Sequence, residues 1–531
     1  MQKISRWVIF EKRSLLVFIL LMLLMFFTIL RIAALATADY TAVADTQNGF
    51  RLNIGKSRGT VYDCNRVPIT NNKEKIIAAV SPTPRAVTAI SAVLEGEKLE
   101  NALEALKSNK PIICELPKWI ECDGIICTKV YETENLIAKH IIGYTDPQGN
   151  GISGIEKAYD DILYSKDDIS IFYESDGMGR ILKGVSPTLT YANKSASHGV
   201  VTTIDINIQS IVEEFAKKIQ KGAIVVAEAQ SGKIRAIVSR PDFDVNNISN
   251  YLNDENSPLL NRAVNAYNVG SVFKPCVAVA GIENNLLNFN YICTGSCEII
   301  DRHFKCHKLD GHGKLNLKNA IAFSCNTYFY NLAFNIGSTT IYKTAKNFGF
   351  GQALKLCRGI ATAKGNLPDS KKLENFAYLA NFSIGQGELL LSPISMLTLY
   401  CSIANNGKYK IPSLIEGTIE NGNFTATPDL YYTRVMSEST AEILKTYLKS
   451  VITVGTGGAA NPKTVSAAGK TATAQTGKYK NGAEICQGWF CGFFPAENPK
   501  YVVTVFSEDI TEQKISCSEI FALIADGITA I

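Results

Sequence analysis

The feature that most restricts the fold of this chain is an uncharged apolar run near its N-terminus. The run SLLVFILLMLLMFFTIL covers residues 14–30, and apolar residues after Arg31 extend it to residue 36. A helix of this length is just long enough to cross a hydrocarbon core of about 30 Å. The stretch ALATA offers small residues for cleavage, but the run exceeds the apolar core of a signal peptide, about 7–15 residues. We therefore predict an uncleaved transmembrane signal anchor over residues 14–36.

Charge flanking this run predicts the orientation of the chain. The residues before it include Lys3, Arg6, Lys12 and Arg13, and basic flanks stay on the cytoplasmic side. No second run of this kind follows. We expect a single-pass protein of the cell membrane, with residues 1–13 as a cytoplasmic tail and the C-terminal domains outside the cytoplasm.

The composition of the rest suits large folded domains. Apolar residues make up 46% of the 531 positions, so two to four domains with substantial cores are expected. The net charge is only +5, and no basic run is interleaved with aromatic residues. A nucleic-acid partner is therefore not expected.

Two parts can be distinguished after the anchor. Residues 40–195 mix short strands with charged helices, and the glycine-marked stretches SRGTVYDCNRVPIT and HIIGYTDPQGNGISGIEKAYDDIL contain no nucleophile–base pair. We interpret this part as a noncatalytic pedestal. From residue 196, a strand and an amphipathic helix precede a hairpin signal at Ser231-Gly232, and three strand-like segments follow residue 463. We predict one α+β domain over 196–531, an antiparallel sheet with helices packed on it.

Three short motifs in this second part suggest chemistry. In Ser271-x-x-Lys274, a helix would place the hydroxyl and the amine on one face, so Lys274 either extends to solvent or accepts the proton of Ser271. Ser324-x-Asn326 is either a second polar element of the site or a helix cap with a core amide. Lys470 begins KTATA, which is either part of the site or an edge strand protected by a lysine.

The cysteines allow two further structures. Cys293, Cys297 and Cys306 crowd one short loop, with His307 beside them. A zinc site is less favoured because the spacing is not of the C-x2-C type. We predict a hairpin whose ends place Cys293 and Cys306 in a disulfide, or at least close enough to form one, and we expect no metal and no cofactor.

The ordered motifs resemble S-x-x-K, S-x-N and K-T-G of the penicillin-recognising serine enzymes. Four further stretches resemble the transpeptidase domain of class B penicillin-binding proteins: NRAVNAYNVGSVFKP, FSIGQGELLLSPISM, IANNGKY and QGWFCGFFPAENPKYVV. RGTVYDCN and the segment around Glu156 are similar to the pedestal of that class. The resemblance covers nearly the whole chain and implies the penicillin-binding serine transpeptidase fold.

The resemblance implies acyl transfer on peptidoglycan stem peptides that end in D-Ala-D-Ala, with Ser271 as the nucleophile. Lys274 would be its base, its pKa lowered by burial and by the nearby cation Lys470. Ser324 would relay a proton, and Asn326 would orient Lys274 and the substrate. The expected substrate-binding residues are Thr471, Ala472, Thr473, Gly385 and Gln386. β-Lactams would be trapped as inhibitors, and a SEDS-type glycosyltransferase of the membrane is the expected partner.

One departure keeps alternatives open. Ala472 stands where the family prefers glycine, and its methyl would narrow the groove if it pointed inward. The alternatives are a hydrolase of the same fold, either a D,D-carboxypeptidase or a β-lactamase, and a noncatalytic β-lactam sensor or scaffold. A β-lactamase has no pedestal, which favours the transpeptidase. The sequence does not distinguish division, elongation and sporulation, nor does it identify the acceptor amine.

Overall fold

The computed structural model describes two compact units of the chain. The described residues are 2–37, 49–166, 168–176, 181–182, 184–190, 194–299, 302–429, 431–480, 482–511 and 513–531. The first unit comprises Met1–Gly55, Ile76–Lys129 and Asp168–Tyr191. The second comprises Lys56–Lys75, Val130–Asp167 and Ala192–Ile531.

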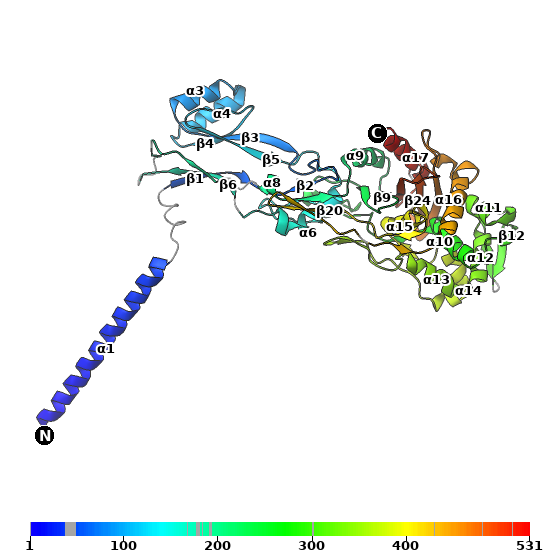
Figure 1. Cartoon of the computed structure of the whole chain (residues 1–531), viewed down its shortest axis with the longest axis horizontal. Helices are drawn as coiled ribbons and strands as arrows, with labels where there is room; N and C mark the ends of the chain where they lie inside the picture. Colours follow the sequence, from blue (N-terminus) through cyan, green and yellow to red (C-terminus); the bar gives the residue numbers. More distant parts are fainter. Residues whose placement is uncertain are drawn as a thin grey trace. The chain divides into compact units, whose positions relative to one another are not determined.

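The N-terminal apolar run forms one long helix, α1 (Gln2–Thr37) (Figure 1). Its segment Lys12–Ala36 is long and apolar enough to cross a membrane, and none of that segment is buried against protein. Exposed leucine, isoleucine and phenylalanine side chains along a whole helix are expected where lipid replaces a protein core. The predicted span of residues 14–36 lies inside this helix.

The first unit also contains two small sheets. The strand order of one is β4-β3-β5, and helices α3 and α4 pack with it around Ala78, Val80, Ile90 and Leu106. Thr83 caps α3 by accepting a hydrogen bond from the Ala86 N–H. The other sheet has the order β1-β6-β7. The bounds are β1 Gly49–Lys56, β3 Lys73–Val80, α3 Pro84–Ser91, α4 Gly96–Leu106, β4 Ile112–Leu116, β5 Ile125–Glu132, β6 Asp168–Glu174 and β7 Thr188–Thr190.

The second unit is built on a five-stranded antiparallel sheet with the order β10-β9-β25-β24-β23. The strands are β9 (Gly222–Glu228), β10 (Ile234–Arg240), β23 (Ala468–Lys480), β24 (Ala483–Phe494) and β25 (Tyr501–Ser507). Strands from the two ends of the domain meet where β25 pairs with β9, with Val503 opposite Val226. The predicted hairpin and the predicted sheet assembled from both ends of the domain are confirmed.

Helices cover both faces of this sheet. On one face, α9 (Ile206–Ala216) and α17 (Cys517–Thr529) contact each other and bury Val212, Ile520 and Phe521 against the strands (Figure 1). On the other face lie α10 (Lys274–Glu283) and α15 (Pro393–Ala404), both almost entirely buried. A helix that is apolar on all sides belongs in the interior of a layered domain, which explains why α10 and α15 lack an amphipathic pattern.

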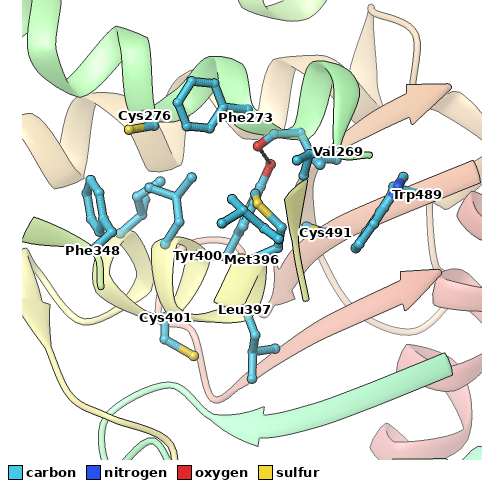
Figure 2. Packing of buried hydrophobic residues seen from close by; sticks show 14 of the residues in the cluster. Val269, Phe273, Cys276, Phe348, Met396, Leu397, Tyr400, Cys401, Trp489 and Cys491 are labelled. Atoms are coloured by element: carbon cyan, nitrogen blue, oxygen red, sulfur yellow. Dashed lines mark hydrogen bonds between the residues drawn. The ribbon is translucent and has the colours of Figure 1, made fainter. Parts of the chain in front are cut away.

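The core between α10, α15 and the sheet supports the start of α10. Phe273 comes from the turn before α10, Tyr400 from α15 and Trp489 from β24, and all three are buried (Figure 2). Tyr400 donates its hydroxyl to the Val272 carbonyl at 2.9 Å. Trp489 donates Nε1–H to the Asn268 carbonyl at 2.8 Å. Two large buried side chains thus hold the backbone on either side of residue 270.

The glycine-marked stretches around residues 58 and 154 meet in this second unit. Arg58 donates Nε–H to Glu156 at 2.6 Å, and its Nη1 lies 2.8 Å from Asp160 Oδ1. Glu156 is buried, and burial raises the pKa of its carboxyl group while Arg58 opposes that effect. Nearby, β2 (Thr60–Tyr62) pairs in parallel with β8 (Gly199–Thr202) in a sheet of order β2-β8-β20-β21.

The remaining elements of the second unit connect these layers. The helices are α5 Lys139–Ile142, α6 Gly154–Ala158, α7 Asp160–Leu163, α8 Lys194–Ser197, η1 Ile248–Tyr251, η2 Gly270–Phe273, α11 Leu317–Ala322, α12 Asn326–Ile336, α13 Ser338–Asn347, η3 Lys372–Glu374, α14 Phe376–Ser383, α16 Glu438–Thr453 and η4 Gly458–Ala460. The strands are β11 Tyr267–Asn268, β12 Asn290–Cys293, β13 Ser296–Ile299, β14 Arg302–Lys305, β15 Gly313–Asn316, β16 Lys355–Cys357, β17 Ile360–Ala361, β18 Leu390–Leu391, β19 Lys408–Tyr409, β20 Ile415–Glu420, β21 Asn423–Ala426 and β22 Thr433–Arg434.

Candidate functional site

The S-x-x-K motif lies on a tight turn that leads into a buried helix. Ser271 is in the 3-10 turn η2, and Lys274 is the first residue of α10. The Lys274 N–H donates to the Ser271 carbonyl, which keeps the two residues one turn apart. Ser271 is half-buried, whereas Lys274 is fully buried. The alternative in which Lys274 extends to solvent is therefore wrong.

The Lys274 amine is held by the second motif. Its Nζ donates to the Ser324 carbonyl at 2.6 Å, to Ser324 Oγ at 3.2 Å and to Asn326 Oδ1 at 2.7 Å. The face of the Phe329 ring lies 5.4 Å from Nζ. Three oxygens and an aromatic face fix the position of one amine, which is the arrangement that a preorganised base requires.

Ser324 has an unusual backbone. Its φ is +56°, in the left-handed region that residues with a side chain rarely occupy. Such conformations cost about 1–3 kcal/mol and persist where the surrounding structure enforces them. Here the Cys325 N–H donates to the Ala320 carbonyl at 3.0 Å, so the chain turns sharply between α11 and α12. The turn directs both the carbonyl and the hydroxyl of Ser324 toward Lys274.

The third motif lies on β23, the last strand in the order of the sheet, which pairs with β24. Side chains alternate along it: Lys470, Ala472 and Ala474 are buried, Thr471 is half-buried, and Thr473 is exposed. Lys470 donates Nζ–H to the Thr471 carbonyl at 3.0 Å and to its hydroxyl at 3.3 Å. The Thr471 hydroxyl is also 3.0 Å from that of Thr456, a residue that sequence reasoning did not single out.

Burial acts on both lysines. It lowers the pKa of Lys274 from 10.5 to about 7. Burial and then the charge of Lys274 hold the pKa of Lys470 well below its usual range. Burial lowers the pKa of Lys274 as predicted. The predicted contribution of Lys470 to that pKa is not found; instead the charge of Lys274 lowers the pKa of Lys470. A neutral lysine near pH 7 can accept a proton from a hydroxyl group.

The turn that carries Ser271 lies close to the backbones of Thr473 and Gly385. Gly270 has φ +66°, and a β-carbon at this residue would lie 3.2 Å from the Thr473 carbonyl oxygen. On the other side, the Gly270 N–H donates to the Gly385 carbonyl at 2.8 Å. Gly385 is buried with φ +73°, and Gln386 beside it is half-buried. Gly385 therefore supports the turn that carries Ser271.

The methyl group of Ala472 packs into the core. Ala472 shares the buried face of β23 with Lys470, and a β-carbon at Gly270 would lie 3.4 Å from its methyl carbon. The side chain thus lies beside the backbone that precedes Ser271. Since Thr471 and Thr473 are on the opposite face of the strand, Ala472 is placed apart from the two threonines expected to bind substrate.

The cysteine-rich insertion folds as predicted but is not disulfide-bonded. Strands β13 and β14 pair as a hairpin, with Cys297 opposite Phe304. All fourteen cysteines are free thiols, so the predicted Cys293–Cys306 disulfide is wrong. The sulfur atoms of Cys293 and Cys306 are nevertheless close, because each lies 3.6 Å from His312 Nδ1. Together with Cys325, these residues form a cluster that could hold a metal ion.

Cys325 and His312 were missed by sequence reasoning. Cys325 is the central residue of the Ser324-x-Asn326 motif, and His312 follows Cys306 by six positions. A cysteine inside a site motif, downstream of a Cys/His-rich insertion, was the signal that could have identified them.

Comparison with known proteins identifies the family. The family model described as the penicillin-binding protein transpeptidase domain matches residues 222–525, a span that contains all three motifs. The chain belongs to the penicillin-binding protein transpeptidase family. The resemblance to class B penicillin-binding proteins is thereby confirmed.

Relatives of this penicillin-binding protein extend over most of its length. It is 26% identical to the peptidoglycan D,D-transpeptidase MrdA of Acinetobacter baumannii, over 89% of this chain and 80% of the relative. It is 26% identical to stage V sporulation protein D of Bacillus subtilis, over 88% of this chain and 76% of the relative. A solved complex between penicillin-binding protein PBP2 and MreC from Helicobacter pylori matches with a TM-score of 0.64 and 21% identity. The match covers 91% of this chain and 98% of that chain.

Proposed function

We propose that this penicillin-binding protein is a peptidoglycan D,D-transpeptidase that crosslinks stem peptides through an acyl-enzyme on Ser271. The observation that carries the proposal is the buried amine of Lys274, held by Ser324 and Asn326 one turn from Ser271. A serine hydroxyl is a weak nucleophile and needs an adjacent base. A lysine whose pKa is about 7 can be that base near neutral pH.

In the first half-reaction, Ser271 Oγ attacks the carbonyl carbon of the penultimate D-Ala while its proton passes to neutral Lys274. The carbonyl oxygen becomes an oxyanion, which the backbone N–H groups of Ser271 and Thr473 receive. The close approach of residue 270 to the Thr473 backbone supports this pairing. Loss of one such donor typically costs about 3–4 kcal/mol of transition-state stabilisation.

The leaving D-Ala needs a proton on its nitrogen. Ser324 is suited to deliver it, because its hydroxyl already accepts from Lys274 and can pass a proton outward. Asn326 accepts from Lys274 through Oδ1, which leaves its amide N–H groups for the substrate backbone. The collapse of the tetrahedral intermediate breaks the D-Ala–D-Ala amide bond and leaves an ester on Ser271.

The terminal carboxylate of the donor peptide is assigned to the strand β23. Thr473 is exposed and Thr471 half-buried there, and Lys470 supplies the nearby amine. In the second half-reaction, the amine of another stem peptide attacks the ester carbon and releases Ser271. A β-lactam resembles the donor and would leave a slowly hydrolysed acyl group on the same oxygen.

The remaining assignments concern the setting of the reaction. We propose residues 40–195 as the pedestal and 196–531 as the transpeptidase domain, anchored by residues 14–36 with residues 1–13 in the cytoplasm. The basic flank of α1 supports this orientation. A SEDS-type glycosyltransferase of the membrane is the proposed supplier of glycan strands. A protein similar to MreC is a second proposed partner, because the Helicobacter pylori neighbour was solved as a PBP2–MreC complex.

The function is tested by labelling full-length protein in detergent with a fluorescent penicillin. Wild-type protein should be labelled once, and Ser271→Ala should not be labelled. Ser338→Ala is the matched control, because it removes one hydroxyl at the start of α13, outside the site. Stoichiometric labelling of Ser271→Ala would disprove the assigned nucleophile. Transfer of a D-Ala-D-Ala peptide to an added amine then distinguishes a transpeptidase, while rapid loss of the label would indicate a β-lactamase.

A further inference from the structure

Four side chains from the cysteine-rich insertion and the second motif converge on one point. Cys293 ends β12, Cys306 follows β14, His312 precedes β15, and Cys325 is the N-cap of α12. Each offers one ligand atom, and the four atoms all lie within 4.8 Å of one another. We propose that Cys293, Cys306, His312 and Cys325 bind one zinc ion, which fixes the turn that carries Ser324 and Asn326.

Three distances between these atoms suit a tetrahedral zinc site. Zn–S bonds of about 2.3 Å and a Zn–N bond of about 2.0 Å in a tetrahedron give S···S edges of about 3.8 Å and S···N edges of about 3.5 Å. In the protein, Cys306 Sγ is 3.9 Å from Cys325 Sγ. His312 Nδ1 is 3.6 Å from Cys293 Sγ and 3.6 Å from Cys306 Sγ. Three of the six edges thus match the ideal values to about 0.1 Å.

The surroundings indicate a closed structural site. Cys293, Cys306 and Cys325 are at most 2% exposed, and His312 is partly buried. Four protein ligands complete a tetrahedron and leave no position for water, which distinguishes a structural zinc site from a catalytic one. Three sulfur ligands and one imidazole favour zinc over magnesium or calcium, which take oxygen ligands.

The site would join two small sheets to a helix of the core. The insertion consists of two small two-stranded sheets, β12 with β15 and β13 with β14. Isolated two-stranded sheets are marginally stable in water. A metal bound by residues from both sheets and from Cys325 would cross-link the insertion to the start of α12. That link would fix the two small sheets relative to α12.

The position of Cys325 connects the metal to the reaction. Cys325 lies between Ser324, whose φ is +56°, and Asn326, and both neighbours hold the Lys274 amine. A metal ligand at the centre of this turn would hold the strained backbone of Ser324 and so position Lys274. Cys325 is therefore a positioning residue. This consequence rests on the proposed function, whereas the binding of zinc does not.

Metal content decides the site directly. Full-length protein purified in detergent and exposed to zinc should retain one zinc per chain after gel filtration, and cobalt(II) in its place should give the visible absorption of tetrahedral cobalt–thiolate. Cys306→Ser and His312→Asn should each lose most of the metal. Cys297→Ser is the matched control, since Cys297 lies on β13 of the same insertion but outside the cluster, and it should keep the metal.

Acylation tests the positioning role. Metal-free wild-type protein should be acylated by penicillin about 100-fold more slowly, as expected for a misplacement of about 1 Å, and zinc should restore the rate. The loss should affect the acylation rate constant and spare the dissociation constant of the initial complex. Thermal unfolding of the metal-free protein checks that the domain remains folded.

Three results would overturn these inferences. Wild-type protein that retains less than a tenth of an equivalent of zinc and gives no cobalt–thiolate absorption would exclude the site. A disulfide among Cys293, Cys306 and Cys325 in protein never exposed to oxidant would exclude it too. Unchanged acylation in folded, metal-free protein would exclude the positioning role alone. Absence of acylation with a full equivalent of zinc would contradict the proposed function and leave the site in place.

Discussion

Gly385 and Gly387, two positions apart and alike in backbone conformation, allow a matched test of how the turn that carries Ser271 is supported. Gly385 has φ +73° and Gly387 has φ +78°. A β-carbon at residue 385 would lie 2.1 Å from the Gly270 carbonyl oxygen, a separation that no relaxed contact permits. A β-carbon at residue 387 would meet only Asn381 Cβ, at an ordinary 3.5 Å. We therefore compare Gly385→Ala with Gly387→Ala.

The expected costs follow from these contacts. Both alanines must occupy the left-handed region, which costs about 1–2 kcal/mol. The lower entropy of the unfolded alanine chain returns about 0.4–1 kcal/mol. Gly387→Ala should therefore lower the free energy of unfolding by about 1 kcal/mol. Gly385→Ala must also displace the backbone of residue 270 by about 1 Å, and such overpacking adds about 1–3 kcal/mol, for a total of about 2–4 kcal/mol.

The two variants should differ still more in acylation. Gly270 directly precedes Ser271, so a shift of its carbonyl moves the nucleophile, and a displacement of about 1 Å can cost about 100-fold in rate. The assay is the second-order rate of labelling by a fluorescent penicillin, measured at a temperature where both variants are folded. Unfolding in denaturant supplies the stability difference. Equal destabilisation of the two variants, or wild-type labelling by Gly385→Ala, would refute the reasoning.

Three further outcomes are expected. Lys274→Arg should lower the acylation rate at least about 100-fold, because arginine stays protonated. The acylation rate of the wild type should rise as pH increases through about 7, where Lys274 becomes neutral. A rate independent of pH in this range would point to another base. Ala472→Gly should lower the free energy of unfolding by about 1–2 kcal/mol, through a lost buried methyl group and a freer backbone. It should not raise the rate of acylation by bulky β-lactams. A rate increase that grows with the size of the drug would place the methyl group in the substrate groove. Burial lowers the pKa of His140 from 6.5 to about 4, so between these pH values only the unfolded state binds this proton. The free energy of unfolding should therefore fall by up to about 3 kcal/mol as pH drops from 6.5 to about 4. Denaturant titrations of His140→Asn at several pH values should lack this pH dependence.

The sequence by itself was sufficient where the structural signal is local. The apolar run of residues 14–36 determines its own helix, because a backbone in lipid must satisfy its hydrogen bonds internally. The alternation of side chains in β23 and the glycine turn at Gly232 predicted the strands and the hairpin from neighbouring residues alone. The order of the three motifs was enough to suggest the family, since each motif is a short segment of contiguous chain.

Tertiary structure alone decided what joins distant segments. Whether Lys274 extends to solvent or stays buried depends on Ser324 and Asn326, about fifty positions away, and on the burial that lowers its pKa. The direction of the Ala472 methyl depends on which face of β23 meets Gly270. Cys293 and Cys306 invited a disulfide by their spacing, yet His312 and Cys325 complete their surroundings. A side chain's charge state and ligands are set by whatever the fold brings within a few ångströms, and chain separation carries little information about that.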